Sequence, residues 1–224
     1  MVLLLNYCIN NQMKFYKAKT RNIQQHQINT CEKFSCETTL EIDSHTGTHI
    51  DYPAHCVKEG KYGETYPAEY LCSLHVKVLY IDLVHELRPK VSIEDIKTND
   101  IPVECEILII KTYFSHLRNE DKYIWTSPII DSEIPVYLKW KFPNIKAVGF
   151  DVISVTSQLD RDEGRKCHYN FLSTDHGREI LIVEDMDLSY LKPESTIEKI
   201  TILPLFFQNM DGSPCSVIAN IKEK

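Results

Sequence analysis

The segment that decides the interpretation of this sequence reads Ser44-His45-Thr46-Gly47-Thr48-His49-Ile50-Asp51-Tyr52-Pro53-Ala54-His55. It holds three of the nine histidines together with one aspartate. Proline, glycine and several β-branched residues argue against a helix here. In an extended chain alternate residues share a face, so His45, His49, Asp51 and His55 would all point the same way.

The distances along this segment restrict its geometry. Four extended residues cover about 13 Å, which two imidazoles can barely span onto one metal ion with bonds of about 2.1 Å. We therefore expect the chain to bend between His45 and His49. Gly47 lies at the midpoint and tolerates unusual backbone angles.

The donor types in this segment point to a metal site. Histidine and carboxylate ligands without cysteine suit zinc, manganese or iron rather than calcium. Structural zinc sites are usually closed and rich in cysteine, whereas catalytic sites keep a position open for water. Three protein ligands and a water molecule would fit this pattern.

Length and composition narrow the class of protein. The chain has 224 residues, of which 43% are hydrophobic and 25% charged, and this excludes disorder and fibrous classes. We expect a single domain over residues 1–224. The net charge of −7 and the scattered lysines argue against nucleic acid and anionic membranes as partners. No apolar run approaches the roughly 20 residues that span a bilayer.

The chain termini and cysteines predict the compartment. Met1–Leu5 is too short for the apolar part of a signal peptide and is better interpreted as a first strand. The eight cysteines include no Cys-x-x-Cys pair, so we expect reduced thiols in a cytoplasmic protein, mostly as small buried residues.

The remaining sequence predicts a mixed α/β domain. Runs rich in Val and Ile predict strands over His75–Leu83, Glu106–Lys111, Ile145–Val152, Arg178–Glu184, Lys199–Phe207 and Cys215–Ile221. The last two should form a hairpin with its turn at 211–214. Helices are expected from a capping-box-like start at 92–95, from Asp131/Ser132 to about Lys141, and over 165–173, where His168, Phe171 and Leu172 would share a face.

Residues 45–55 match the pattern His-x-Gly-Thr-His-x-Asp-x-Pro-x-His in full. This resembles the signature of the metal-dependent cyclase family, which includes bacterial kynurenine formamidase (arylformamidase) and isatin hydrolase. The resemblance continues along nearly the whole chain, in the segments 66–71, 106–112, 145–155 and 211–214. It implies a swivelling β/β/α fold, a mixed sheet with a few helices, and a homodimer or larger homo-oligomer.

The resemblance also implies a site with two ions per chain, Zn²⁺ or Mn²⁺. His45, His49 and Asp51 would bind the first ion, and Asp51 would bridge to the second. His55 would be the catalytic proton carrier. His168 and Glu184 would complete the second ion's ligands, with His176 as the competing histidine. Asp151 could orient one of the ligands or could simply be an acid at the end of a strand.

These residues predict a hydrolase of an amide-type carbonyl. A divalent ion lowers the pKa of bound water to about 7 and polarises a carbonyl. The family resemblance favours an arylformamidase that converts N-formyl-L-kynurenine to L-kynurenine and formate in tryptophan catabolism. Three alternatives stay open: a hydrolase of a cyclic amide or lactone such as isatin, a polyketide-type cyclase or dehydratase, and a metal-binding protein without activity. Phe15 and Tyr16 could stack on an aryl ring, although core packing is the simpler interpretation.

Overall fold

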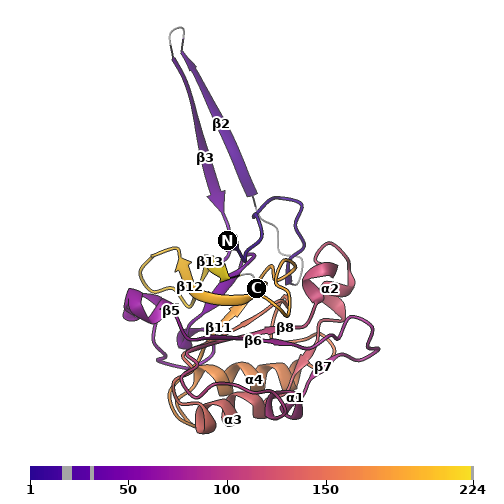
Figure 1. Cartoon of the computed structure of the whole chain (residues 1–224). Coiled ribbons are helices and arrows are strands. Elements are labelled where there is room, and N and C mark those ends of the chain that lie inside the picture. The colour runs from indigo at the N-terminus through magenta and orange to yellow at the C-terminus, as the bar shows by residue number, and fades with distance from the viewer. Residues whose placement is uncertain (17–21, 31–32, 223–224) are drawn as a thin grey trace.

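The computed structural model describes residues 1–16, 22–30 and 33–222. One nine-stranded mixed sheet forms the centre of the molecule (Figure 1). Its main path runs β5-β12-β13-β4-β11-β10-β8-β6, and β1 pairs with β13. In chain order these strands are β1 (Val2–Leu4), β4 (His49–Asp51), β5 (Cys72–Ser73), β6 (Val76–Tyr80), β8 (Ile107–Lys111), β10 (Ala147–Phe150), β11 (Leu181–Glu184), β12 (Thr196–Pro204) and β13 (Gly212–Lys222).

The sheet has a parallel half and an antiparallel half. Strands β6, β8, β10 and β11 run parallel to one another, whereas β12 and β13 form an antiparallel pair. Strand β4 lies at the seam and is antiparallel to both β11 and β13. The histidine-rich motif at residues 45–55 therefore contains the strand that joins the two halves of the sheet.

The parallel strands are buried on both faces, which explains their continuous apolar sequences. In β8, Leu108 and Ile110 belong to the core between the sheet and its helices. Ile107 and Ile109 belong to a second core on the opposite face. All six strands predicted from Val- and Ile-rich runs are present, and so is the first strand near Met1.

Three helices cover one face of the sheet, α1 (Ile93–Lys97), α3 (Glu133–Lys141) and α4 (Arg161–Leu172) (Figure 1). The capping box at Ser92 is present, because its side chain and that of Asp95 accept from each other's backbone N–H. Helix α4 begins four residues earlier than predicted because the Asp160 carboxylate caps it by accepting from Glu163 N. A fourth helix, α2 (Lys122–Trp125), was not predicted.

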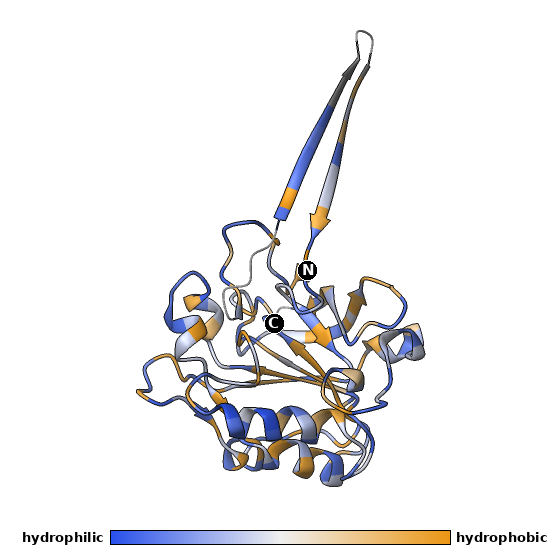
Figure 2. Cartoon of the chain, turned by 180° about the vertical axis from the view of Figure 1, so that it is seen from behind, coloured by the Kyte–Doolittle hydropathy of each residue, from blue (hydrophilic) through white to orange (hydrophobic). Residues whose placement is uncertain are grey.

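Two further pairs of strands lie outside the main sheet. Strands β7 (Lys90–Val91) and β9 (Ile129–Ile130) form a short parallel pair. Strands β2 (Asn22–Thr30) and β3 (Lys33–Glu41) form an antiparallel arm that projects from the body on the side opposite the helices (Figure 1). The described part of the arm is mostly hydrophilic (Figure 2). The arm was not predicted from the sequence, because neither of its strands alternates apolar and polar residues.

Two sequence expectations need correction. The β12–β13 hairpin is present, but its connection spans 205–211, and Gly212–Pro214 already pair with β4. The cysteines are less buried than expected, because Cys8, Cys36 and Cys56 are exposed. Their exposure follows from their places in loops and on the arm. All seven cysteines in the described ranges are free thiols, and Cys31 lies outside these ranges.

Among the residues that the structure describes, no helix has the length and apolar character needed to cross a bilayer.

Candidate metal centre

Strand register places the central motif. In β4, Ile50 points into the core and is fully buried, so its neighbours His49 and Asp51 point to the other face. His49 pairs with Glu184 in the adjacent strand, which brings two potential ligands side by side. The predicted bend is present at Gly47, whose φ is +63°. This angle strains any residue with a Cβ atom.

The extended geometry predicted for 45–55 holds only over His49–Asp51. The chain then turns through a 3₁₀ helix at Pro53–His55, where the fixed φ of proline suits the first helical position. His55 therefore reaches the site from this turn and not from the strand. The bend and the turn together let all three histidines converge within a short stretch of sequence.

Four buried side chains form the deep part of the site, which we call the deep cluster. It comprises His49, Asp51, His168 and Glu184. His168 Nε2 lies 3.3 Å from Asp51 Oδ2 and 3.1 Å from Glu184 Oε1. His49 Nε2 lies 3.4 Å from both Asp51 Oδ1 and Glu184 Oε2. Each of the two histidines therefore points its Nε2 atom at the carboxylates of Asp51 and Glu184.

Contacts behind the deep cluster fix these orientations. His49 Nδ1 lies 2.7 Å from the carbonyl oxygen of Gly47, and His168 Nδ1 lies 2.9 Å from the hydroxyl of Thr156. Glu184 Oε1 accepts from Val155 N at 2.6 Å. A histidine held through Nδ1 presents Nε2 to a metal ion, which is the usual arrangement in metal sites.

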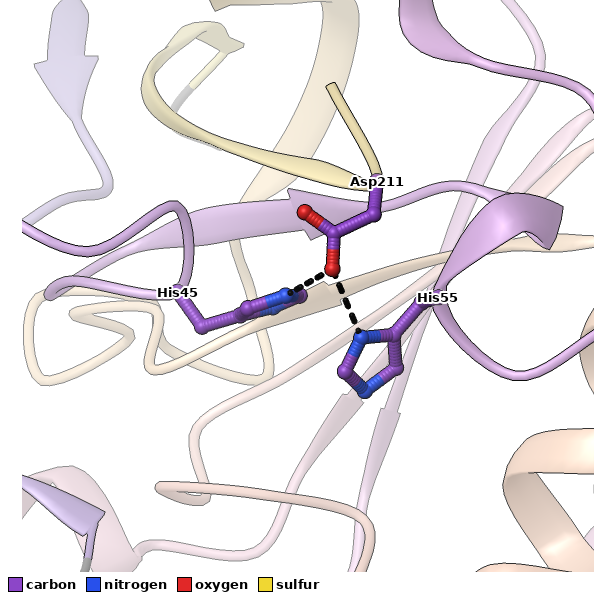
Figure 3. Close-up of side chains that lie close together, drawn as sticks. All are labelled: His45, His55 and Asp211. Atoms are coloured by element: carbon purple, nitrogen blue, oxygen red, sulfur yellow. Dashed lines mark hydrogen bonds and ion pairs between the residues drawn. The ribbon is translucent and has the colours of Figure 1, made fainter. Parts of the chain in front are cut away.

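Three more side chains form the solvent-facing rim of the site, which we call the rim group: His45, His55 and Asp211 (Figure 3). Asp211 Oδ2 lies 3.0 Å from His45 Nε2 and 3.2 Å from His55 Nδ1. His45 Nδ1 also lies 2.8 Å from Asp51 Oδ1, so His45 links the rim to the deep cluster. From the sequence, Asp211 was expected only as part of a turn. Its position directly before β13, the neighbour of β4, was the signal that could have placed it here.

The electrostatics of the site favour positive charge at its centre. Burial alone would lower the pKa of His168, but Glu184 and Asp51 outweigh it and raise the pKa to about 10. Burial also opposes the charged form of His45, yet Asp211 and Asp51 raise its pKa to about 9. The pKa of Glu184 is lowered, because His168 and His49 outweigh burial and the repulsion of Asp51.

The residues fit a divalent cation. Asp51 Oδ2 is buried, and its contact with His168 Nε2 at 3.3 Å lacks hydrogen-bond geometry, so this carboxylate oxygen still needs a partner. Donor atoms of His45, His49 and Asp51 all lie within 4.8 Å of one another, and so do those of Asp51, His55 and His168. Asp51 belongs to both groups. Nitrogen and carboxylate donors suit zinc or manganese.

His168 and His176, the two candidates for the histidine ligand of the second ion, lie in different places in the structure. His168 lies in α4 and joins the deep cluster, whereas His176 is exposed in the turn after the helix. Phe171 and Leu172 share the buried face of α4 with His168, as predicted. Asp151 is buried, but its carboxylate oxygens accept from Thr112 and Ser115, so it holds the loop after β8.

A cavity of about 290 Å³ opens onto these groups. The deep cluster, His45 and His55 line it, and Tyr16 from the N-terminal segment contributes an aromatic wall. Tyr16 also packs against the core, so both interpretations of its side chain apply. Two arginines of α4, Arg161 and Arg165, complete one side of the cavity. No sequence pattern had marked either arginine as a site residue.

The family model described as "Putative cyclase" matches residues 5–157. The chain belongs to this cyclase family. Kynurenine formamidase of Geobacillus thermodenitrificans is 28% identical over 176 residues, which are 78% of this chain and 75% of that protein. Cyclase-like protein 2 of Arabidopsis thaliana is 27% identical over 191 residues, which are 80% of this chain and 63% of that protein.

Solved structures confirm the cyclase-like fold. One, described as a potential metal-dependent hydrolase with cyclase activity, has a TM-score of 0.73 at 22% identity and covers 100% of this chain and 98% of its own. Isatin hydrolase A from Labrenzia aggregata has a TM-score of 0.77 at 18% identity, with 100% and 94% covered. The mixed α/β architecture expected from the sequence is that of the family.

Proposed function

We propose that this cyclase-family chain is a metal-dependent hydrolase of an amide carbonyl, with N-formyl-L-kynurenine as its substrate and formate and L-kynurenine as its products. The observation that carries the proposal is the pairing of a buried donor cluster with a partly exposed histidine at the cavity mouth. His55 has Nδ1 engaged by Asp211, which leaves Nε2 to exchange a proton with a molecule in the cavity. A purely structural metal site has no use for such a group.

Two sets of ligands are proposed for two ions, Zn²⁺ or Mn²⁺. His45, His49 and Asp51 would hold the first, and Asp51, His168 and Glu184 the second. A bound divalent ion lowers the pKa of water and polarises a carbonyl oxygen. The shared carboxylate of Asp51 would keep the two ions together.

The chain's own residues divide the remaining work. The cavity walls position the amide over the deep cluster and exclude bulk water from it. His55 would donate the proton that the leaving aryl amine needs when the C–N bond breaks. Asp211 keeps the His55 ring oriented through its contact with Nδ1, as a carboxylate does behind a catalytic histidine.

The formamidase relative favours N-formyl-L-kynurenine over the cyclic amides, lactones and polyketide precursors that share this chemistry. The likeness to isatin hydrolase carries the fold alone, because the identity is 18%. A homodimer and a cytoplasmic place in tryptophan breakdown stay predictions. Light scattering on the purified protein tests the homodimer.

Formate release from N-formyl-L-kynurenine tests the proposal. The protein is stripped with a chelator, assayed, and assayed again after Zn²⁺ or Mn²⁺ is added. We expect turnover of about 1–10³ s⁻¹ to return with the metal. Absence of turnover while bound metal is measured by elemental analysis would contradict the formamidase and move the substrate to the cyclic amides or lactones.

A further inference from the structure

We propose that Arg161 and Arg165 bind a carboxylate group of the substrate, so that the enzyme acts on amides that carry a carboxylate and not on neutral amides. The inference rests on the proposed hydrolase function and deepens it by naming the substrate class. It concerns one wall of the cavity that none of the metal-ligand residues accounts for.

The placement of the two arginines comes from helical spacing. Arg161, Arg165 and His168 follow one another at intervals of four and three residues, so they share a face of α4. All three line the cavity. With a rise of 1.5 Å per residue, Arg165 lies about 4.5 Å and Arg161 about 10.5 Å along the helix from His168. A substrate with its amide at the deep cluster would therefore meet them several bonds away.

The charge pattern of the cavity singles them out. Its lining includes three carboxylates, Asp43, Asp51 and Glu184, and its only lysine or arginine side chains among the described residues are Arg161 and Arg165. Arg161 is the first residue of α4, in the turn where the helix dipole disfavours cations and favours anions. Helix stability therefore gives no reason for arginine at position 161.

Arg161 also lacks a counterion within the described part of the chain. Its Nε is buried and donates no hydrogen bond there, and no ion pair forms on its guanidinium in these residues. A buried guanidinium donor without an acceptor costs free energy, which an anion in the cavity would recover. Among the residues that the structure describes, Arg165 forms an ion pair with Asp162 of its own helix. Both side chains are more than half exposed, so this pair yields easily to a ligand.

A guanidinium recognises a carboxylate through paired hydrogen bonds, which a neutral carbonyl cannot match in strength. Two guanidiniums on one helix face would therefore discriminate between an amino-acid amide, such as a formylated kynurenine, and a neutral ring, such as isatin. The ring of Tyr16, which also lines the cavity, would contact the aryl part of either molecule. The arginines would thus set specificity without taking part in bond breaking.

Calorimetric binding of the product L-kynurenine and of a neutral analogue tests the inference without relying on turnover. The probes are L-kynurenine, which carries a carboxylate, and 2-aminoacetophenone, which keeps the aryl ketone but lacks the amino-acid group. Both are titrated into the metal-loaded protein and into Arg161→Gln, Arg161→Lys and Arg165→Gln. Lys166→Gln is the matched control, because Lys166 lies on α4 but pairs with Glu133 outside the cavity.

We expect L-kynurenine to bind the unaltered protein and the control at least about tenfold more tightly than the neutral ketone, since a charge-assisted hydrogen bond is worth about that factor. Arg161→Gln should remove most of this preference, and Arg161→Lys should restore part of it. Arg165→Gln, at a side chain that is 59% exposed, should reduce it as well.

Three results would overturn the inference: no preference in the unaltered protein, no binding of L-kynurenine at all, or a preference that survives both glutamine substitutions. The last would place the carboxylate on the metal. Loss of the proposed function is a separate result, because the protein would then bind L-kynurenine with an arginine-dependent preference yet release no formate from the formylated substrate.

Discussion

The deep cluster and the rim group use the same residue types but differ in how they are held. The side chains of the deep cluster are no more than 7% exposed, whereas the rim side chains are between a quarter and two fifths exposed. Neighbouring strands and α4 fix the deep side chains, whereas the rim group belongs to turns that flank β4 and β13. Buried charges cannot relax toward solvent, so the deep cluster is suited to hold a cation, whereas the rim side chains are open to water.

The largest effect should follow from breaking the deep cluster at its shared carboxylate. Asp51→Ala should remove both ions and abolish turnover, because Asp51 belongs to both donor groups. Residues that only hydrogen-bond to a metal ligand typically cost about 10–100-fold in metal affinity when they are replaced. The loss in Asp51→Ala should be roughly an order of magnitude larger. Elemental analysis after dialysis measures the metal. Two ions retained by Asp51→Ala would refute the bridge.

A second substitution separates the rim from the deep cluster. His55→Ala should keep both ions and lower kcat by about 10²–10⁴-fold, which is the usual contribution of a proton-transfer residue. The matched control is His116→Ala, since His116 is exposed and lies outside the cavity. Full activity in the His55 variant would disprove the assigned role.

A milder change at the rim sharpens the comparison further. Asp211→Asn keeps the shape of the side chain but removes the charge that orients His45 and His55. We expect kcat to fall by about 10–100-fold while the second ion stays bound. Steady-state kinetics together with metal content test this. A change in KM alone would mean that Asp211 contacts substrate instead of positioning histidines.

The smallest effect concerns stability in the absence of metal. The carboxylates raise the pKa of His45 to about 9 and of His168 to about 10, above the value of about 6.5 for an unfolded histidine. Between about pH 6.5 and pH 10 the folded chain therefore binds more protons than the unfolded chain. Its free energy of unfolding should fall as the pH rises through this range.

Denaturant titrations of the chelator-treated protein at pH 6 and pH 9.5 measure this change. We expect a loss of on the order of 1–2 kcal/mol after allowance for screening by solvent. Addition of Zn²⁺ should flatten the dependence, because the ion takes the place of the protons. A stripped protein that is equally stable at both pH values would contradict the assigned electrostatics.

The strands show how far sequence patterns reach. Strands of the parallel half, such as β8 and β10, were predictable because burial on both faces requires unbroken apolar runs. The arm of β2 and β3 was not, because its described side chains are mostly exposed and no periodic pattern marks its sequence. Helix α4 was predicted short by one turn, because its cap at Asp160 lies before a polar stretch.

By itself, the sequence determined the chemistry of the first motif. Its donor types, the bend at Gly47 and the cyclase-family pattern are all local features of residues 45–55. Only the tertiary structure decided which distant residues complete the site. It brought His168 to the deep cluster, left His176 in an exposed turn, and added Asp211 and the two arginines of α4. The reason is that contacts across more than a hundred residues depend on strand order and helix placement, which local periodicity does not encode.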